Sequence, residues 1–358
     1  MAELEKIMGV SADDIEKIMG IDKGDIEKIM GVEIPASLKA YQGLTSFLIA
    51  GFGTSDNVDT SSEEVFTLST TSTGTASDAG DLGTARETHF VGGSNVSNGN
   101  RIVLGGGDTN VGGWSNLIDI DYFTPASYSG GSSSFGDLTG SYSKNCAGIS
   151  NGTIAISAMG HKGSYVLDLD RITIASTGDA SDVGDATVTG NGPSGTSTLS
   201  RGIHAGGFIY AGGAYYRNDI GYIDMSSPGD ASDFGDLTDK SNFGSSSCPS
   251  TESRVILRWG GYGMEGTSGS TAASEIDYVN PTSTANSSDF GDQNVQRRYP
   301  AATSSDNIRG QRFGGGGSGG GDDTNSGECE YITIASTGNA STMNDLPHHK
   351  RDSAGWAA

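Results

Sequence analysis

Basic residues are scarce in this chain of 358 residues. Lysine and arginine together number 21 against 44 aspartate and glutamate residues, which gives a formal net charge of −23 at pH 7. Proteins that hold the phosphate backbone of a nucleic acid do so with basic patches, so this composition argues against nucleic acid as a partner. A large net charge of one sign also favours solubility and suppresses non-specific association.

Cysteine and histidine, which are common metal ligands, are also rare. The three cysteines, Cys146, Cys248 and Cys329, are far apart and include no CxxC pair, so they predict neither a disulfide framework nor a zinc site. We expect small buried thiols instead. The five histidines show no spacing typical of metal ligands, and we expect them on the solvated surface. They are His89, His161, His204, His348 and His349.

Long hydrophobic runs are absent as well. The first five residues, MAELE, are acidic where a secretory signal peptide is basic, and no apolar stretch long enough to cross a membrane follows them. The sequence therefore predicts neither a signal peptide nor insertion into a membrane.

Glycine, by contrast, is abundant, with 57 copies. The glycines follow no every-third-residue pattern, which excludes collagen, and they separate short β-branched and aromatic runs, as in strands joined by tight turns. The clearest repeated phrase is GDASDFGDLT at residues 229–238, and degraded copies centre on residues 80, 136, 184, 291 and 344. Successive copies are 48 to 56 residues apart, and about 50 residues is the length of a kelch-type propeller repeat.

Each repeat shows the same order of predicted strands. A first strand ends in small or polar residues, a second ends in a pair of glycines, and a third follows a turn rich in glycine and serine. The second strands are predicted at 102–106, 209–213, 256–261 and 311–315, with weaker versions at 49–53 and 156–160. The SDFGDLT element then adds a turn and a short outer strand. Four strands in one repeat make one propeller blade.

The two ends of the repeat region complement each other. The first repeat begins at residues 46–49 without a leading strand, and the last repeat ends with a surplus strand at 350–357. Pairing of the two would complete a sixth blade and remove the open sheet edges. The sequence therefore predicts an all-β fold, a six-bladed kelch-like β-propeller over residues 37–358, with four-stranded blades and closure by the N- and C-terminal strands.

Residues 1–36, the leader, contain a different and shorter repeat. The phrase EKIMG begins at residues 5, 16 and 27, an 11-residue period. Ile15, Ile18 and Met19 are spaced as on one face of a helix, and Ser or Asp before the acidic turns and Gly after each copy suit helix caps. One unbroken helix with this period would supercoil to the right. Three short helices separated by glycine fit the caps better, and the segment ends at Pro35.

Three phrases carry a resemblance to a known family. The glycine pair after a second strand resembles kelch repeats, and YITIASTGNA at 331–340, with the SDFGDLT phrase, looks like kelch-like propeller proteins of tailed-phage virions. The IEKIMG phrase of the leader is similar to segments at the N-termini of phage structural proteins. The propeller resemblance covers residues 44–358. It implies a virion-associated structural or fibre-like protein, made in the host cytoplasm, and it identifies no chemistry.

The first function compatible with this resemblance is a structural one, as in a tail fibre or a decoration protein. Short amphipathic helices are marginal alone, so we expect the leader to dock on other virion proteins, or on sister chains in a homo-oligomer, and to leave the propeller displayed. The alternative is a helical cap on the body of its own chain. The predicted docking residues are Ile7, Met8, Ile15, Ile18, Met19, Ile26, Ile29 and Met30.

The second function is host attachment, in which one face of the propeller binds a glycan or a protein of the bacterial surface. A glycan site needs exposed aromatic rings for stacking, beside polar groups that bind hydroxyls. Candidates in the variable loops between strands are Trp114, Tyr215, Tyr216, Arg217 and Tyr262.

Catalysis is not predicted, and no cofactor or metal is implied. Asp230, Asp233 and Asp236 are three residues apart, which is not the spacing of a calcium loop, so we expect them to bond the nearby backbone in turns. A kelch-type oxidase such as galactose oxidase uses copper and a cysteine-linked tyrosine; Cys329 and Tyr331 are the nearest candidates, without a histidine pair close in sequence. The glycine run at 314–321 lacks the lysine of a phosphate loop and predicts a loop between strands.

Overall fold

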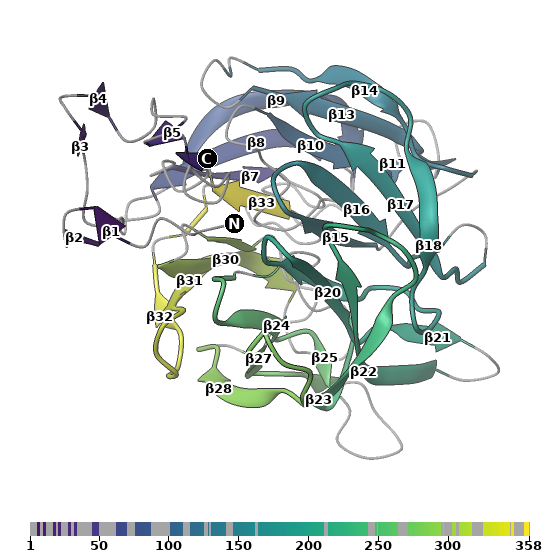
Figure 1. The fold of residues 1–358 in the computed structure, drawn as a ribbon, viewed down its shortest axis with the longest axis vertical. Helices are drawn as coiled ribbons and strands as arrows, with labels where there is room; N and C mark the ends of the chain where they lie inside the picture. Colours follow the sequence, from purple (N-terminus) through teal and green to yellow (C-terminus); the bar gives the residue numbers. More distant parts are fainter. Residues whose placement is uncertain are drawn as a thin grey trace.

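The computed structural model shows an all-β chain. Besides short strands of the leader, it describes residues 45–49, 62–69, 76–86, 101–109, 115–124, 128, 130–140, 146–161, 164–210, 214–242, 248, 250–263, 271–294, 296, 303–305, 308–316, 325–343, 345–346 and 354–357. In this part of the chain there is no helix, and beyond the leader the strands form six antiparallel sheets of three or more strands (Figure 1). The all-β prediction is confirmed.

We number the sheets 1 to 6 in chain order and name their strands in spatial order. Sheet 1 contains β33 (Ala354–Ala357), β7 (Thr45–Ile49), β8 (Ser62–Ser69) and β9 (Ser77–Arg86). Sheet 2 contains β10 (Ile102–Gly105), β13 (Asp119–Phe123) and β14 (Ser133–Asp137), with a separate hairpin of β11 (Asp108–Thr109) and β12 (Ser115–Asn116). Sheet 3 contains β15 (Ala147–Ser150), β16 (Ile154–Ala158), β17 (Asp168–Thr173) and β18 (Ser181–Asp185).

The second half of the chain continues the pattern. Sheet 4 contains β19 (Ser194–Ser197), β20 (Arg201–Ala205), β22 (Ala214–Asp224) and β23 (Ser232–Asn242), and β21 (Phe208–Tyr210), β25 (Tyr262–Gly263) and β26 (Thr271–Ala272) extend it. Sheet 5 contains β24 (Val255–Trp259), β27 (Glu275–Val279) and β28 (Ser288–Asp292). Sheet 6 contains β29 (Thr303–Ser305), β30 (Arg309–Gly316), β31 (Asn325–Thr333) and β32 (Ser341–Thr342). The glycine run at 314–321 was predicted as a loop, but its first three glycines belong to β30, the end of which pairs with the start of β31; the rest of the run lies outside the described residues.

The leader contains three small hairpins in place of the predicted helices. They are β1 (Lys6–Ile7) with β2 (Val10–Ser11), β3 (Lys17–Ile18) with β4 (Ile21–Asp22), and β5 (Lys28–Ile29) with β6 (Val32–Glu33). Ile7, Ile18 and Ile29 therefore lie in strands, and the prediction of helices through them is wrong. The pairing of Ile7 with Val10 leaves two residues for the connection, and the second is glycine in every copy, as two-residue hairpin turns favour.

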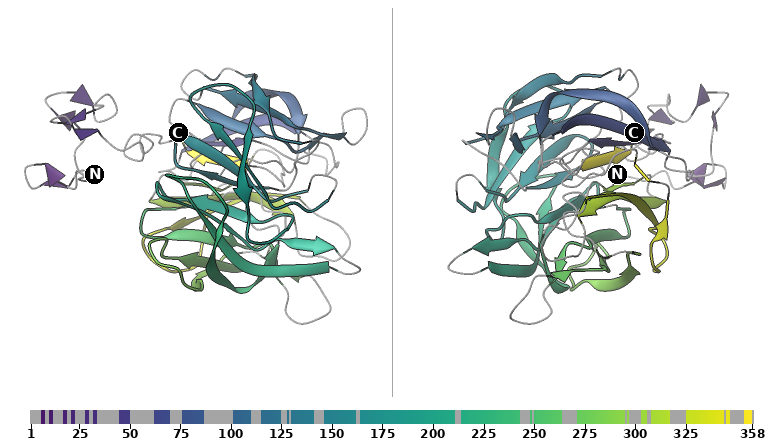
Figure 2. Two further views of the ribbon diagram at one scale, coloured as in Figure 1. Left: turned by 45° about the vertical axis from the view of Figure 1, so that its right-hand side comes forward. Right: turned by 180° about the vertical axis from the view of Figure 1, so that it is seen from behind.

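The other predicted docking residues lie outside the described residues. They are Met8, Ile15, Met19, Ile26 and Met30. Figure 2 shows the purple hairpins of the leader beside the six sheets rather than among them.

The two ends of the repeat region pair as the sequence predicts. β33 is antiparallel to β7, with Trp356 opposite Phe47, and completes the four strands of sheet 1. In Figure 1 the yellow β33 lies next to the purple β7. The last residues of the chain thus cover an edge of the first sheet that would otherwise be open to other strands.

The SDFGD phrase forms the outer strand of the sheets that contain it. Its backbone angles and its closeness to the neighbouring segment of the chain require a glycine at the fourth position. Gly235 and Gly291 have φ of 146° and 142°, which side chains other than glycine's rarely adopt. A Cβ atom on Gly235 would lie 2.5 Å from the carbonyl oxygen of Ala285, just before the next outer strand. Each such glycine stands at a β-bulge, which bends the outer strand. The phrase therefore repeats because each outer strand passes close to its neighbour.

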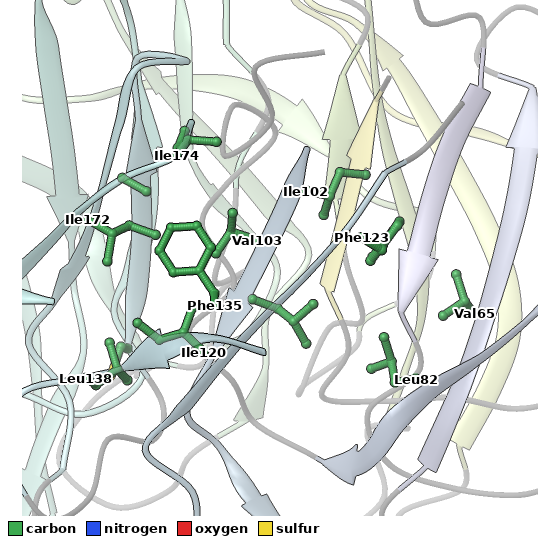
Figure 3. Close-up of a cluster of buried hydrophobic side chains, with 13 residues drawn as sticks. Val65, Leu82, Ile102, Val103, Ile120, Phe123, Phe135, Leu138, Ile172 and Ile174 are labelled. Carbon is green, nitrogen blue, oxygen red and sulfur yellow. The ribbon is translucent and has the colours of Figure 1, made fainter. Parts of the chain in front are cut away.

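Neighbouring sheets are packed through buried apolar clusters. The largest cluster joins sheets 1, 2 and 3: Val65 and Leu82 come from sheet 1, Phe135 from sheet 2, and Ile172 and Ile174 from sheet 3 (Figure 3). Further clusters join sheets 3 and 4, 4 and 5, and 5 and 6. Another contains residues of sheets 6 and 1. Burial of these side chains, at about 25 cal/mol per Å² of apolar surface, supplies the main stabilisation.

The glycine pair marks the end of the second strand, and the structure corrects its place in sheet 4. The second strand there is β20, followed by Gly206 and Gly207 with φ of 68° and 102°. The segment 209–213, which the sequence assigned to this role, contributes instead to β21, a hairpin partner of β22. In sheet 3, Met159 takes the place of the first glycine with φ of 62°. Two glycine pairs within ten residues made the sequence pattern ambiguous.

Arginine side chains link successive sheets. The guanidinium of Arg254 lies 4.6 Å from the ring centroid of Tyr278 in sheet 5, and its Nη1 donates a hydrogen bond of 2.8 Å to the carbonyl oxygen of Ile334 in sheet 6. The equivalent links are Arg101 over Tyr122 to Ile174 and Arg201 over Tyr222 to Pro281. Each combines a cation–π contact with a charge-assisted hydrogen bond.

Buried carboxylates form a second set of links. Asp277 of sheet 5 accepts hydrogen bonds of 2.7 and 2.8 Å from the hydroxyl of Thr238, at the end of the SDFGDLT phrase in sheet 4. Burial raises the pKa of Asp277, while the bonds from Thr238 and the charge of Arg258 act in the opposite direction. The equivalent pairs are Thr139 with Asp170 and Asn294 with Glu330. Between sheets 1 and 2 the link runs through Ser132, whose hydroxyl accepts a hydrogen bond of 3.1 Å from the backbone N–H of Gly83 and donates one of 3.3 Å to Asp121.

Removal of the C-terminal strand should destabilise the whole chain. Truncation after residue 349 deletes β33 and exposes the backbone of β7, so we expect aggregation or a fall in melting temperature, measured by circular dichroism and light scattering. A control that lacks only Ala358, beyond β33, should behave like the parent. A truncated protein that melts at the parental temperature would contradict this role.

Candidate ligand-binding surface

Three of the five predicted loop candidates lie together on β22, and a fourth lies nearby in the same sheet. Past its glycine pair, sheet 4 continues into a smaller sheet in the order β21–β22–β23–β25–β26, of which β25 and β26 come from the chain after β24. Tyr215, Tyr216 and Arg217 lie on β22 and Tyr262 on β25. The register places Arg217 opposite Ser241, which pairs with Gly263. Trp114 lies outside the described residues.

One face of the β21–β22 hairpin carries a row of packed rings, which we call the aromatic row. It runs from His161 to Tyr165 in the loop of sheet 3, then to Phe208 on β21 and Tyr216 on β22. Successive ring centroids are 5.3, 6.1 and 5.9 Å apart, the range in which aromatic pairs attract. All four side chains are half-buried. Of these four residues, only Tyr216 was among the candidates predicted from the sequence. The other three belong to segments that meet it only in the folded chain.

The opposite face of the hairpin carries Tyr215, Arg217 and Asp219, which we call the tyrosine face. Alternation along β22 puts Tyr215 and Arg217 on one side, and Asp219, which follows an irregularity in the ladder, is placed beside Arg217 by an ion pair. The Tyr215 side chain is 57% exposed. Arg217 and Asp219 form an ion pair with Nη1 and Oδ2 3.6 Å apart, and both side chains remain partly exposed. An exposed ring beside a charged donor and acceptor matches the composition expected of a glycan site.

The aromatic row spans the junction between sheets 3 and 4. In the described part of the chain, this is the one junction where both the arginine link and the carboxylate link are replaced by other residues. Between sheets 3 and 4, the register puts Ile154 where other sheets have the linking arginine. Gly221 stands where they have the carboxylate, and a Cβ atom there would collide with the His204 ring. Asn151 instead donates a long hydrogen bond of 3.4 Å to the carbonyl oxygen of Met225. The rings of the row therefore supply a larger share of the contact between these sheets.

His204 is the buried group of this junction. It is 1% exposed, so the expectation of solvated histidines is wrong here; the small Gly221 opposite it leaves space that only a large side chain fills. Its Nε2 has no hydrogen-bond partner. Burial lowers the pKa of His204 to about 4, against a weaker opposing effect of Asp219. His161 is half-buried, and the other three histidines, His89, His348 and His349, lie outside the described residues.

The remaining sequence candidates have structural partners. The cysteines are free and buried as predicted, and burial raises the pKa of Cys329 to about 12, which makes its thiol a poor nucleophile. Tyr331 packs under Arg309, with 4.6 Å from the guanidinium to the ring centroid. Among the described residues there is no group of three or more His, Cys, Asp and Glu that could hold a metal ion, and no helix that could cross a membrane.

Aspartates of the GDASDFGD phrase bond to backbone in two ways, of which only the first is the predicted turn chemistry. Asp289 accepts a hydrogen bond of 2.9 Å from the backbone N–H of Gly291 in its own turn. Asp230 instead accepts one of 3.0 Å from the backbone N–H of Asp185 in the preceding sheet. This second role joins residues 45 positions apart and was not visible in the sequence.

Comparison of the sequence with models of known protein families and with curated proteins finds no match.

The burial of neutral His204 predicts acid sensitivity. The pKa falls from 6.5 to about 4 on folding, so between these values the unfolded chain binds a proton that the folded chain does not. Stability should be full above pH 6.5 and fall by about 1.4 kcal/mol for each pH unit down to about 4. Urea denaturation at pH 7 and pH 5 measures this loss. His204→Gln should lose less stability over the same interval, and an equal loss in both proteins would contradict the assignment.

Calcium should leave the stability of the protein unchanged. The carboxylates of Asp230 and Asp289 already accept backbone hydrogen bonds, and a ligand that binds only the folded state must raise its melting temperature. Thermal melts with millimolar calcium, and with chelator as the control, test this expectation. A calcium-dependent rise that Asp230→Asn removes would show that the phrase binds the ion.

Proposed function

We propose that residues 37–358 fold as a six-bladed kelch-like β-propeller and that the chain is a non-enzymatic structural protein of a bacteriophage virion. The observation that carries the propeller is the contact between the last sheet and the first. Phe313 and Cys329 of sheet 6 share a buried cluster with Phe66 of sheet 1. With the clusters that join the other neighbours, the six sheets contact one another in a cyclic order, as blades do around an axis.

The first strands of the sheets, which would be the inner strands of a propeller, support the same arrangement. In sheets 3 and 4 these strands, β15 and β19, are fully buried, although they consist mainly of small and polar residues. Ser250 donates a hydrogen bond of 2.7 Å to the carbonyl oxygen of Ser197, and Thr196 donates one of 3.0 Å to that of Cys248. Small side chains that bond the backbone of the next inner strand allow these strands to approach closely, as the centre of a propeller requires.

The leader is the proposed attachment to the particle. Its three hairpins have the same register in each 11-residue copy, and a two-stranded hairpin of this size is not stable alone in water. Three equivalent elements that each need a partner favour a repeated docking surface, on another virion protein or on sister chains. The propeller is then displayed away from the attachment.

A second function, host attachment, is favoured by the tyrosine face. Exposed aromatic rings are costly to leave in water and are typical of binding surfaces. The two functions are compatible, because the leader and the β21–β22 hairpin lie in different parts of the chain. The third candidate, a kelch-type oxidase, gains no support from Tyr331, whose ring is covered by Arg309.

Deletion of residues 1–36 should separate folding from assembly. We expect a folded, soluble and monomeric propeller that is absent from purified particles, measured by circular dichroism and by immunoblot of particles. Ile18→Asp with Ile21→Asp, which pair across β3 and β4, should reduce incorporation as well, because an unpaired charge is costly to bury at a contact. Lys17→Gln in the same copy serves as the control. Full occupancy of the deleted protein in particles would sink the attachment proposal.

A further inference from the structure

We propose, on the basis of the host-attachment function above, that the tyrosine face binds a neutral polysaccharide. The Tyr215 ring stacks on the apolar face of a pyranose ring, and Arg217 and Asp219 bind its hydroxyls. This assignment gives the surface one ligand class and sets it apart from the aromatic row on the other side of the same hairpin.

Exposure distinguishes Tyr215 from most rings of the chain. The large hydrophobic side chains left exposed among the described residues are Tyr210 at 65%, Tyr215 at 57% and Ile308 at 66%. Tyr215 stands opposite Ile209 across the hairpin, which makes Ile209 its cross-strand neighbour on this face. A tyrosine ring offers a large contact area and loses little conformational entropy on binding.

The polar groups that a sugar needs lie next to this ring. Arg217 follows Tyr215 at two positions on the same face of β22 and is paired with Asp219, and the two side chains are 25% and 41% exposed. Their 3.6 Å separation is longer than a hydrogen bond, so a bound hydroxyl can accept from the guanidinium and donate to the carboxylate. Sugar hydroxyls both donate and accept, and the pair supplies both complements.

Charge argues against an anionic polymer and favours a neutral one over it. The Arg217–Asp219 pair has no net charge, whereas the whole chain carries −23. A polyanion would meet this field along its whole length with only one arginine in its favour, and like-charge repulsion slows and weakens such encounters. A neutral polymer meets no such penalty, and several chains on one particle would multiply a weak contact.

Native affinity electrophoresis of the full-length protein tests the proposal. The gels contain dextran, mannan or galactan as neutral probes, and alginate or hyaluronate as anionic probes. We expect retardation by at least one neutral probe and by neither anionic one. Tyr215→Ala should weaken that binding by about tenfold or more, while Tyr215→Phe, which keeps the ring, should retain most of it. Two matched controls, Tyr210→Ala on the opposite face and Ile308→Ala on sheet 6, should bind like the parent.

Three results would overturn the assignment. The first is that no neutral probe retards the protein. The second is that Tyr215→Ala and Tyr210→Ala lose equal amounts of polysaccharide binding. The third is that Tyr215→Ala loses adsorption to intact host cells although the protein binds no neutral probe, which would indicate a protein ligand. Incorporation into particles, measured on the same variants, keeps the two proposals apart. A chain that incorporates normally but binds no polysaccharide refutes the ligand class and leaves the structural function intact.

Discussion

Hydrogen bonds between the outer strands of neighbouring sheets are the constraint on which the rest of the structure depends. The backbone N–H of Ser287 donates to the carbonyl oxygen of Asp236 at 2.8 Å, and the backbone N–H of Asp236 donates back to the side chain of Asn286 at 3.1 Å. Equivalent bonds join sheets 2 and 3, 3 and 4, and 5 and 6. Such bonds form only if two backbones come close, which requires a glycine in the outer strand. The repeat length, the bulge and the phrase SDFGD all follow from that approach.

The junction between sheets 3 and 4 keeps these outer bonds but replaces the arginine and the carboxylate by Ile154, Gly221 and His204. Its stability depends more on shape and on ring contacts, and less on charge. Protonation of His204 would place an unpaired charge in this interface, so acid weakens this junction. Because the aromatic row bridges the same junction, the hairpin that carries the tyrosine face is supported by a part of the structure that is sensitive to pH.

The sequence predicted what repeats and failed where a unit departs from the repeat. The outer strands, the pairing of the two ends and the buried cysteines followed from spacing and composition. The second strand of sheet 4 was misplaced, because Gly206-Gly207 and Gly212-Gly213 offer the same local signal and only pairing with β22 decides between them. The leader was taken as helical, because its apolar spacing fits a helix as well as it fits strands separated by glycine. The contact of Phe208 with Tyr165, which connects Tyr216 to the rings of sheet 3, joins separate repeats, which local patterns do not reveal.

The arrangement also explains why a ligand surface would lie on the β21–β22 hairpin. In each repeat the outer strand is committed to its neighbour, and the second and third strands carry the residues of the interfaces. Substitution at Gly235, Asp277 or Arg254 would break a link between sheets, so these positions are not available for a ligand. The connection after the glycine pair differs in length and composition from repeat to repeat, and in sheets 3 and 4 it carries the aromatic row. In sheet 4 this connection forms the β21–β22 hairpin, and Tyr215 lies on it outside the buried clusters that join sheet 4 to its neighbours. A change at Tyr215 therefore tests binding with little effect on the fold.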